Sequence, residues 1–262
     1  MLLPLMSAAQ SVFSPQQWGA KGDGRTDDTR AIQQCIDACA NSGGGTVFFA
    51  EGKTYLSGPL QLRGNINYLF GRGSRLLADP RESVYTLSAF GDNRGEGMLW
   101  LWANGEDNIT ISGAGAIDGN GVAFMGKELE DSYELKPLKD PKFDPRPHLL
   151  TLFGCRNIDI SGVTIQNGAY WTVHLVGCDG AKIHDMSLLN QLKIRNGDGI
   201  DLDHTRNVEI WNCHIESGDD CICLKNRREY SPGYKEAFTY LNEKGIVMRS
   251  QQCRDIQVRN CV

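Results

Sequence analysis

The chain has 262 residues and a mass of 29.0 kDa, and 40% of its residues are hydrophobic. This length and composition support a sizeable buried core and exclude a disordered chain. A formal net charge of -5 and a pI near 5.6 exclude nucleic-acid binding through a general positive field, so any anionic substrate needs local Arg or Lys side chains.

Residues 1–10 carry a short apolar run, Leu2 to Met6, followed by three small residues, Ser7 to Ala9. This order is typical of the end of a secretory signal, although the charged residues that open such a signal are missing. A signal-peptide remnant and a disordered N-terminus both fit. No other stretch approaches the roughly 18 apolar residues of a membrane span, and we predict a single domain over residues 11–262.

One amphipathic helix is predicted after the polar stretch that ends at Asp28. Ile32, Cys35, Ile36 and Cys39 follow at i, i+3, i+4 and i+7. Asp27, Asp28 or Thr29 can cap the start of this helix, and the glycines at 43–45 end it.

The later chain repeats itself. Four segments that begin at Asn157, Gly180, Asn207 and Asp255 share one pattern, at offsets of 23, 27 and 48 residues (180 − 157, 207 − 180, 255 − 207). A second short strand pattern precedes each segment, at 148–154, 171–177, 199–205 and 221–226, and fainter coils occur between residues 46 and 120. The apolar columns are Ile158, Ala181, Val208 and Ile256; Ile160, Ile183, Ile210 and Val258; Val163, Met186, Cys213 and Cys261; and Ile165, Leu188 and Ile215.

Short strands at a fixed period, with thirty glycines for the turns, predict an all-β solenoid whose open end the N-terminal helix covers. Asn167 and Asn190 recur at one turn, where Asn tolerates left-handed backbone and can bond along the stack. The period fails at 121–146 and at 226–245, so both segments are predicted to leave the coils as insertions.

The nine cysteines are an odd number without a disulfide framework. Cys221 and Cys223 lie on one strand face and lack the spacing of a zinc knuckle, so we interpret the cysteines as buried small apolar residues. We expect no metal and no cofactor.

Five aspartates crowd residues 196–225. Ile200 and Ile222 are equivalent in the repeat, 22 residues apart (222 − 200), so Asp198 lies one coil from Asp220 and Asp219 adjoins them. Carboxyl groups this close repel, and at least one should have a raised pKa. Inverting glycoside hydrolysis uses such a set, with carboxyl groups about 6.5–9.5 Å apart.

Calcium binding would also use clustered carboxylates, and surface turns are rich in Asp for purely structural reasons. Both alternatives stay open on spacing alone. Asp201 and Asp203 differ from the other three, because alternation places them opposite Ile200 and Leu202. We expect a solvated or groove-lining strand face there.

Three stretches resemble the polygalacturonases of glycoside hydrolase family 28: "WGAKGDGRTDDTRAIQQCIDAC", "NGDGID" and "SGDDCICLK". The resemblance implies a right-handed parallel β-helix. It also implies that Asp219 is the general acid, that Asp198 and Asp220 hold the attacking water, and that Asn196 belongs to the same site. Trp171, one coil before Asp198, either packs at a turn or contacts sugar.

The sequence departs from the family pattern at several points. Gly197 stands where the family usually has Thr, no His occurs after His214, and no Arg-x-Lys follows. We expect a C-terminally truncated chain or an atypical branch. Lys225 is our candidate for binding the substrate carboxylate, with Arg227 and Arg228 beside it, although exposed loop charges are the simpler interpretation of all three.

The sequence therefore predicts a monomeric, secreted or periplasmic glycoside hydrolase that cleaves α-linked galacturonate in pectic polysaccharides or oligosaccharides, with no nucleic-acid partner. A calcium-dependent pectate lyase would instead use the carboxylates for metal and an Arg or Lys as the base. A noncatalytic β-helix that binds glycan is the third hypothesis.

Overall fold

A computed structural model describes residues 11–89, 97–128, 133–135, 145–231 and 245–262. The predicted signal remnant at 1–10 lies outside these residues, as do parts of both predicted insertions. Within the described part of the chain, no helix has the length and apolarity needed to cross a membrane.

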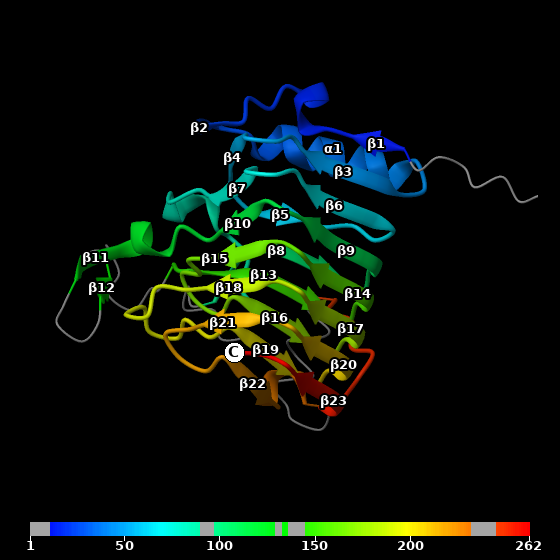
Figure 1. Ribbon diagram of the computed structural model, residues 1–262, viewed down its shortest axis with the longest axis vertical. Helices are drawn as coiled ribbons and strands as arrows, with labels where there is room; N and C mark the ends of the chain where they lie inside the picture. The colour runs from blue at the N-terminus through cyan, green and yellow to red at the C-terminus, as the bar shows by residue number, and fades with distance from the viewer. Residues whose placement is uncertain (1–10, 90–96, 129–132, 136–144, 232–244) are drawn as a thin grey trace, which may run out of the picture.

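Three parallel sheets lie side by side around one axis, and the coils stack along that axis (Figure 1). The first holds β1 (Val12–Phe13), β3 (Gly45–Phe49), β6 (Ile66–Phe70), β9 (Asp107–Gly113), β14 (Arg156–Ser161), β17 (Asp179–His184), β20 (Arg206–Trp211) and β23 (Arg254–Arg259). The second holds β2 (Asp23–Asp27), β4 (Thr54–Ser57), β7 (Arg75–Ala78), β10 (Ala116–Asp118), β15 (Thr164–Gln166), β18 (Ser187–Leu189) and β21 (His214–Glu216). The third holds β5 (Leu60–Gln61), β8 (Met98–Asn104), β13 (Pro147–Phe153), β16 (Val173–Val176), β19 (Ile200–Asp203) and β22 (Ile222–Lys225). Successive coils contribute one strand to each sheet, so the predicted β-helix is confirmed.

The predicted interior columns match the observed strand register. Ile158 pairs with Ala181, which pairs with Val208. In the same sheet Ile160 pairs with Ile183, which pairs with Ile210. These side chains are buried, as are Ile165 and its stacked partners in the second sheet. Each coil thus buries apolar surface only by stacking on its neighbours, which is why the period dominates the sequence.

Helix α1 (Thr29–Asn41) covers the N-terminal end of the stack (Figure 1), as predicted. Its buried residues are the four predicted ones, and its N-cap is Asp28. The carboxylate of Asp28 makes no cap hydrogen bond; it accepts from the backbone amides of Lys21 and Gly22 instead. Four short 3-10 helices complete the helical elements described: η1 (Pro15–Trp18), η2 (Glu82–Val84), η3 (Gly121–Phe124) and η4 (Arg228–Tyr230).

Asparagine shapes the turns, but not quite as predicted. Asn167 has a left-handed backbone with φ of 53°, as predicted, whereas Asn190 does not. The side chain of Asn190 bonds along the stack to Gly168 and Thr172, which confirms the other part of the prediction. A second asparagine column lies near the start of strands in the first sheet, at the second residue of β9 and of β14. The Nδ2 of Asn157 donates to the Oδ1 of Asn108 at 3.0 Å, and both residues have left-handed backbones.

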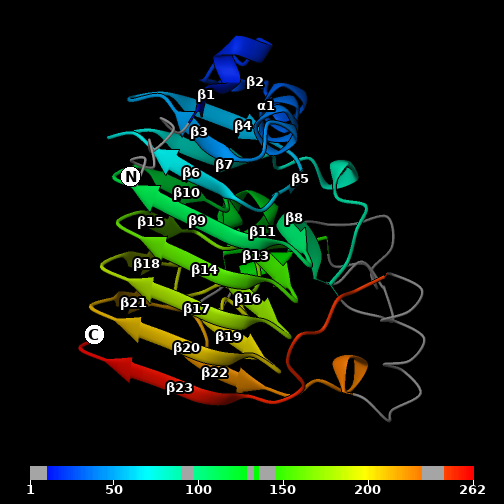
Figure 2. The ribbon, with the colours of Figure 1, turned by 90° about the vertical axis from the view of Figure 1, so that its right-hand side faces the viewer.

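Both predicted insertions leave the coils. After η3 the chain forms an antiparallel hairpin of β11 (Met125–Glu128) and β12 (Tyr133–Leu135). The second insertion starts after β22, and Figure 2 shows η4 and residues 245–253 beside the stack rather than within it. Tyr230 of η4 is fully buried and packs against Phe153 of the third sheet.

The cysteines are free thiols, and most are buried small residues as interpreted. Four cysteines differ: Cys221 is exposed just before β22, and Cys223, Cys253 and Cys261 are partly exposed. Cys213 is buried at its predicted place in the interior column, where burial first, and then the neighbouring Cys261, raise the pKa of its thiol to about 11.

Candidate active site

The two predicted carboxylate turns lie on successive coils. Ile200 of β19 pairs with Ile222 of β22, so Asp198 and Asp220 occupy equivalent positions just before these strands. The amide of Gly199 donates to the carbonyl oxygen of Asp220 at 2.9 Å, and the hydroxyl of Ser217 donates to the carbonyl of Gly197 at 2.7 Å. These bonds fasten one turn to the next, so the predicted 22-residue offset is confirmed.

The three predicted catalytic carboxylates differ in exposure. Asp198 is only 3% exposed, whereas Asp219 and Asp220 are exposed. Burial raises the pKa of Asp198 above its ordinary value, Lys225 opposes this, and the charge of Asp219 adds to it. A raised pKa within the cluster was predicted from mutual repulsion, but burial is the larger cause.

Asp201 contradicts the prediction of a solvated strand face, because its side chain is fully buried. Burial first, and then the charge of Asp198, raise the pKa of Asp201 to about 8. Asp201 lies in register between His174 of β16 and Cys223 of β22. The alternation placed it on the outward face correctly, but this face is covered.

Lys225 is not the exposed loop charge that the simpler interpretation predicted. Its side chain is 16% exposed, and its Nζ lies 3.1 Å from Oδ2 of Asp198 and 3.0 Å from Oδ1 of Asp201. Burial alone would lower the pKa of Lys225, but the two carboxylates raise it above its ordinary value. Lys225 therefore lies inside the carboxylate cluster.

Trp171 lies one coil before Asp198, as predicted, since the amide of Thr172 donates to the carbonyl of Asp198 at 3.0 Å. The indole is 6% exposed, its ring centre is 5.0 Å from that of His174, and the Nζ of Lys225 lies 4.2 Å from its centre. These contacts favour the packing interpretation of Trp171.

Asn196 lies two residues before Asp198 and is half-buried, with a left-handed backbone (φ 54°). This backbone turns the chain into the segment that carries Asp198. The structure thus places Asn196 on the same turn as the buried carboxylate, in a conformation that Asn adopts at lower cost than most residues.

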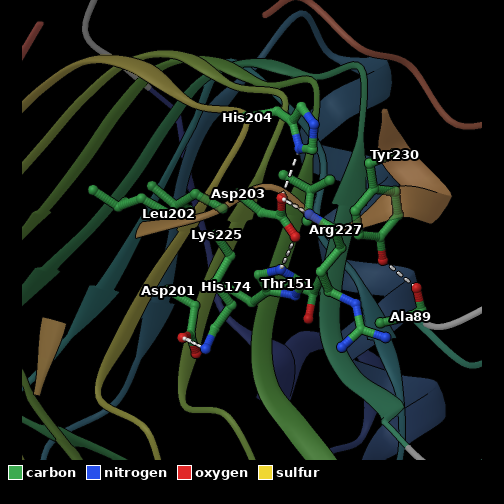
Figure 3. A network of polar contacts seen from close by, with 12 residues as sticks. Ala89, Thr151, His174, Asp201, Leu202, Asp203, His204, Lys225, Arg227 and Tyr230 are labelled. Atoms are coloured by element: carbon green, nitrogen blue, oxygen red, sulfur yellow. Dashed lines mark hydrogen bonds and ion pairs between the residues drawn. The ribbon is translucent and has the colours of Figure 1, made fainter. Parts of the chain in front are cut away.

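Asp203 also contradicts the solvated interpretation and joins a buried network (Figure 3). Its Oδ1 contacts Nδ1 of His204 at 2.6 Å and accepts from the amide of Arg227 at 3.1 Å, and its Oδ2 lies 3.7 Å from Nε2 of His174. Burial alone would raise the pKa of Asp203, but the contacts with the two histidines lower it.

The far nitrogen of His204 lies 2.9 Å from the Ser231 hydroxyl, which donates to the carbonyl of Arg227 at 2.9 Å. Because this hydroxyl proton is directed at a carbonyl, the Asp203, His204 and Ser231 contacts form a clasp and not an activated nucleophile. The clasp fixes the segment after β22 against the sheet. Sequence reasoning missed both histidines, although His174 stands in register beside Asp201.

The described residues contain no group of three or more His, Cys, Asp or Glu side chains that could hold a metal ion. The three predicted catalytic carboxyl groups have different surroundings. Asp198 is buried beside the ammonium group of Lys225, whereas Asp219 and Asp220 on the next turn are exposed to solvent. Such a set can hold a water molecule and exchange protons with a ligand.

Comparison with known proteins gives two family matches. Residues 83–231, more than half of the chain and including all three carboxylates, match the glycosyl hydrolases family 28. Residues 12–79 match a second model, described as rhamnogalacturonase A/epimerase, pectate lyase-like.

Individual relatives agree with this assignment. A probable polygalacturonase of Vitis vinifera is 28% identical over 252 residues, covering 90% of this chain and 48% of its own length. The family 28 exopolygalacturonase of Yersinia enterocolitica shares the fold with a TM-score of 0.75 at 21% identity, over 97% of this chain and 49% of that one. A putative glycosyl hydrolase of Parabacteroides merdae superposes with a TM-score of 0.68 at 19% identity, over 96% of this chain and 95% of its own.

The chain spans about half the length of the curated relatives it matches. The family match contains the turns of Asp198, Asp219 and Asp220, which the stacked coils bring together. The chain belongs to family 28 of the glycosyl hydrolases.

Proposed function

We propose that this protein hydrolyses α-linked galacturonate in pectic polysaccharide or oligosaccharide by a single displacement that inverts the anomeric centre. The observation that supports it is the pairing of a buried carboxylate, Asp198, with exposed carboxylates at the equivalent turn of the next coil. Several relatives are named polygalacturonases or exopolygalacturonases, which supports the same substrate class.

In this proposal Asp219 is the general acid. Asp219 is exposed, so a substrate can reach it. Within this turn, its Oδ1 accepts one hydrogen bond, from the backbone amide of Asp220 at 3.1 Å. Asp219 gives its proton to the glycosidic oxygen as the bond from that oxygen to the anomeric carbon breaks. The departing sugar leaves as an alcohol.

Asp198 and Asp220 hold the attacking water. One oxygen of Asp198 is bound by Lys225, and its Oδ1 has no hydrogen-bond partner among the described residues. The water forms the new bond to the anomeric carbon from the opposite face and passes its proton to this carboxylate pair. Asn196, on the same turn, is proposed to bond a sugar hydroxyl.

The substrate carboxylate requires cations near the site. Lys225, our candidate from the sequence, lies inside the carboxylate cluster. The guanidinium group of Arg227 lies near the Trp171 ring, with its Cζ 5.5 Å from the ring centre. Of the three substrate-binding residues predicted from the sequence, we retain Asn196; the burial of Trp171 and the ion pairs of Lys225 favour packing and support of the site for these two. A polymeric pectic substrate also favours action outside the cytoplasm, in a secreted or periplasmic protein.

The test is digestion of polygalacturonate followed by measurement of reducing ends, with proton NMR of the first-formed anomer. We expect the β anomer at early times, and Asp219→Asn should lower kcat by about 10²–10⁴-fold. Asp159→Asn, on the outer face of the first sheet, is the matched control and should retain full activity.

Unchanged turnover in Asp219→Asn would remove the catalytic assignment. An unsaturated uronide product that disappears on addition of a chelator would instead establish the lyase alternative. Binding of galacturonate oligomers with no turnover in the wild type would leave the glycan-binding alternative.

A further inference from the structure

The ammonium group of Lys225 is surrounded by protein acceptors. Its Nζ lies 3.1 Å from Oδ2 of Asp198, 3.0 Å from Oδ1 of Asp201 and 3.3 Å from the sulfur of Cys223. The ring of Trp171 covers it from a further side, at 4.2 Å. The contacts with Asp198 and Cys223 are hydrogen bonds, and the contact with Asp201 is an ion pair.

This arrangement has a direct consequence for Asp198. Binding of Oδ2 to Lys225 fixes the rotation of the carboxylate and leaves Oδ1 without a hydrogen-bond partner among the described residues. This oxygen is buried, and a buried acceptor without a protein partner is a site for one ordered water, which it binds in a defined direction. Positioning of this kind lowers the barrier by removing rotational freedom before the reaction.

Asp201 completes the charge balance. It is fully buried, it shares the ammonium with Asp198, and the two carboxyl groups interact directly (Figure 3 shows the contact of Asp201 with Lys225). One cation cannot neutralise two buried carboxylates, so one of the pair retains its proton at neutral pH. The raised pKa of Asp201, from burial and the charge of Asp198, assigns that proton to Asp201.

We propose that Lys225 and Asp201 are positioning residues of the hydrolytic site, which together hold the Asp198 carboxylate so that its free oxygen orients the attacking water. This inference rests on the proposed function for the identity of the water, but the geometry it describes can be tested without turnover. It also changes the role expected for Lys225. A substrate carboxylate would have to compete with two buried carboxyl groups for the same ammonium.

The kinetic test uses Lys225→Met, which keeps an unbranched stem against Trp171 but removes the charge. We expect kcat on polygalacturonate to fall about 10²-fold, with KM changed less than about threefold. Lys182→Met, an exposed lysine on β17, is the matched control and should behave as the wild type. A raised KM with unchanged kcat would overturn the proposal, because it would mean that Lys225 binds the substrate directly.

The second test follows the side-chain carboxyl carbons of aspartate by carbon-13 NMR during a pH titration. Removal of the cation in Lys225→Met should raise the pKa of Asp198, whereas Asp201→Asn should leave it nearly unchanged, because Asp201 is already neutral where Asp198 titrates. A raised pKa of Asp198 in Lys225→Met supports the proposal, and an unchanged Asp198 in that variant overturns it. If Lys225→Met fails to fold, Asp201→Asn decides the question: it should abolish an aspartate titration near pH 8, and a titration that persists there overturns the proposal.

The two proposals fail in different ways. A wild-type protein that does not hydrolyse polygalacturonate, while Lys225→Met raises the pKa of Asp198, removes the proposed function and keeps the positioning of Asp198. An active wild type whose Asp198 is insensitive to Lys225→Met removes the positioning and keeps the function.

Discussion

Strand β19 buries both of its faces, but by different means. Ile200 and Leu202 point inward and are covered by the same apolar columns in β16 and β22. Asp201 and Asp203 point outward and are equally buried, yet their cover consists of charged and polar side chains from other coils and from the segment after β22. A repeat therefore specifies the cover of its inward face, while the cover of the outward face depends on residues that do not repeat.

Removing the outward carboxylate at Asp203 should have the largest effect on stability. Asp203→Ala leaves His174, His204 and the amide of Arg227 without their acceptor, and we expect the free energy of unfolding to fall by about 3–5 kcal/mol. Denaturant unfolding at neutral pH measures this difference.

The pH dependence of that difference identifies its electrostatic origin. The pKa of Asp203 is lowered in the folded protein, so its stabilisation is present above the unfolded value of about 3.9 and is lost as the pH falls toward the folded value. The wild type and Asp203→Ala should therefore converge in acid. A difference that stays constant in acid would contradict the ionised network.

The loss of stability caused by a substitution on the inward face should not depend on pH. Leu202→Ala deletes a fully buried side chain and should lower the free energy of unfolding by about 2–5 kcal/mol through lost transfer energy and the cavity left behind. The same denaturant series, repeated at acid and neutral pH, should show one value. A loss that depends on pH would mean that the two faces are coupled through the strand.

Asp201→Asn should show the opposite pH dependence to Asp203→Ala. The folded pKa of Asp201 is raised to about 8, so its contribution is fully present below the unfolded value of about 3.9 and is lost as the pH rises through about 8. The groups that face it are Asp198, Lys225, His174 and Cys223. The stability of Asp201→Asn relative to the wild type should thus rise across this range, by at most about 1.4 kcal/mol per pH unit.

Unfolding curves at several pH values between 4 and 8 measure this slope. The matched variant is Asp159→Asn, at a partly exposed position of the first sheet, which should show a flat difference. A flat difference for Asp201→Asn as well would mean that Asp201 is ionised in the folded protein.

The sequence predicted what the period controls. The inward columns, the capping helix and the stacking of Asp198 on Asp220 all follow from equivalence between coils, and the register confirms them. The burial of Asp201 and the ion pairs of Lys225 did not follow. Alternation decides which face a side chain occupies, but whether that face meets water depends on side chains that do not repeat: Lys225 beside Asp201, and the segment after β22 beside Asp203.

The catalytic roles rest on a different kind of inference. Asp219 was selected by its motif and its neighbours, and the structure shows an exposed carboxylate there without a feature that distinguishes an acid.

The left-handed asparagines could have been predicted from the sequence, since Asn108, Asn157 and Asn207 recur near the start of strands in the first sheet.

The smallest effect is expected at these left-handed asparagines, which are exposed near the start of their strands. Asn157 has φ of 54°, and its side chain donates to Asn108 at 3.0 Å. Asn157→Ala should cost about 1–2 kcal/mol, because a Cβ without a polar partner is strained in the left-handed region. Asn157→Gly removes the same hydrogen bond but adopts this backbone freely, so it should cost less than Asn157→Ala in thermal unfolding. Equal losses for Gly and Ala would assign the cost to the asparagine column, which would then stabilise the stack as a chain of side-chain hydrogen bonds between coils.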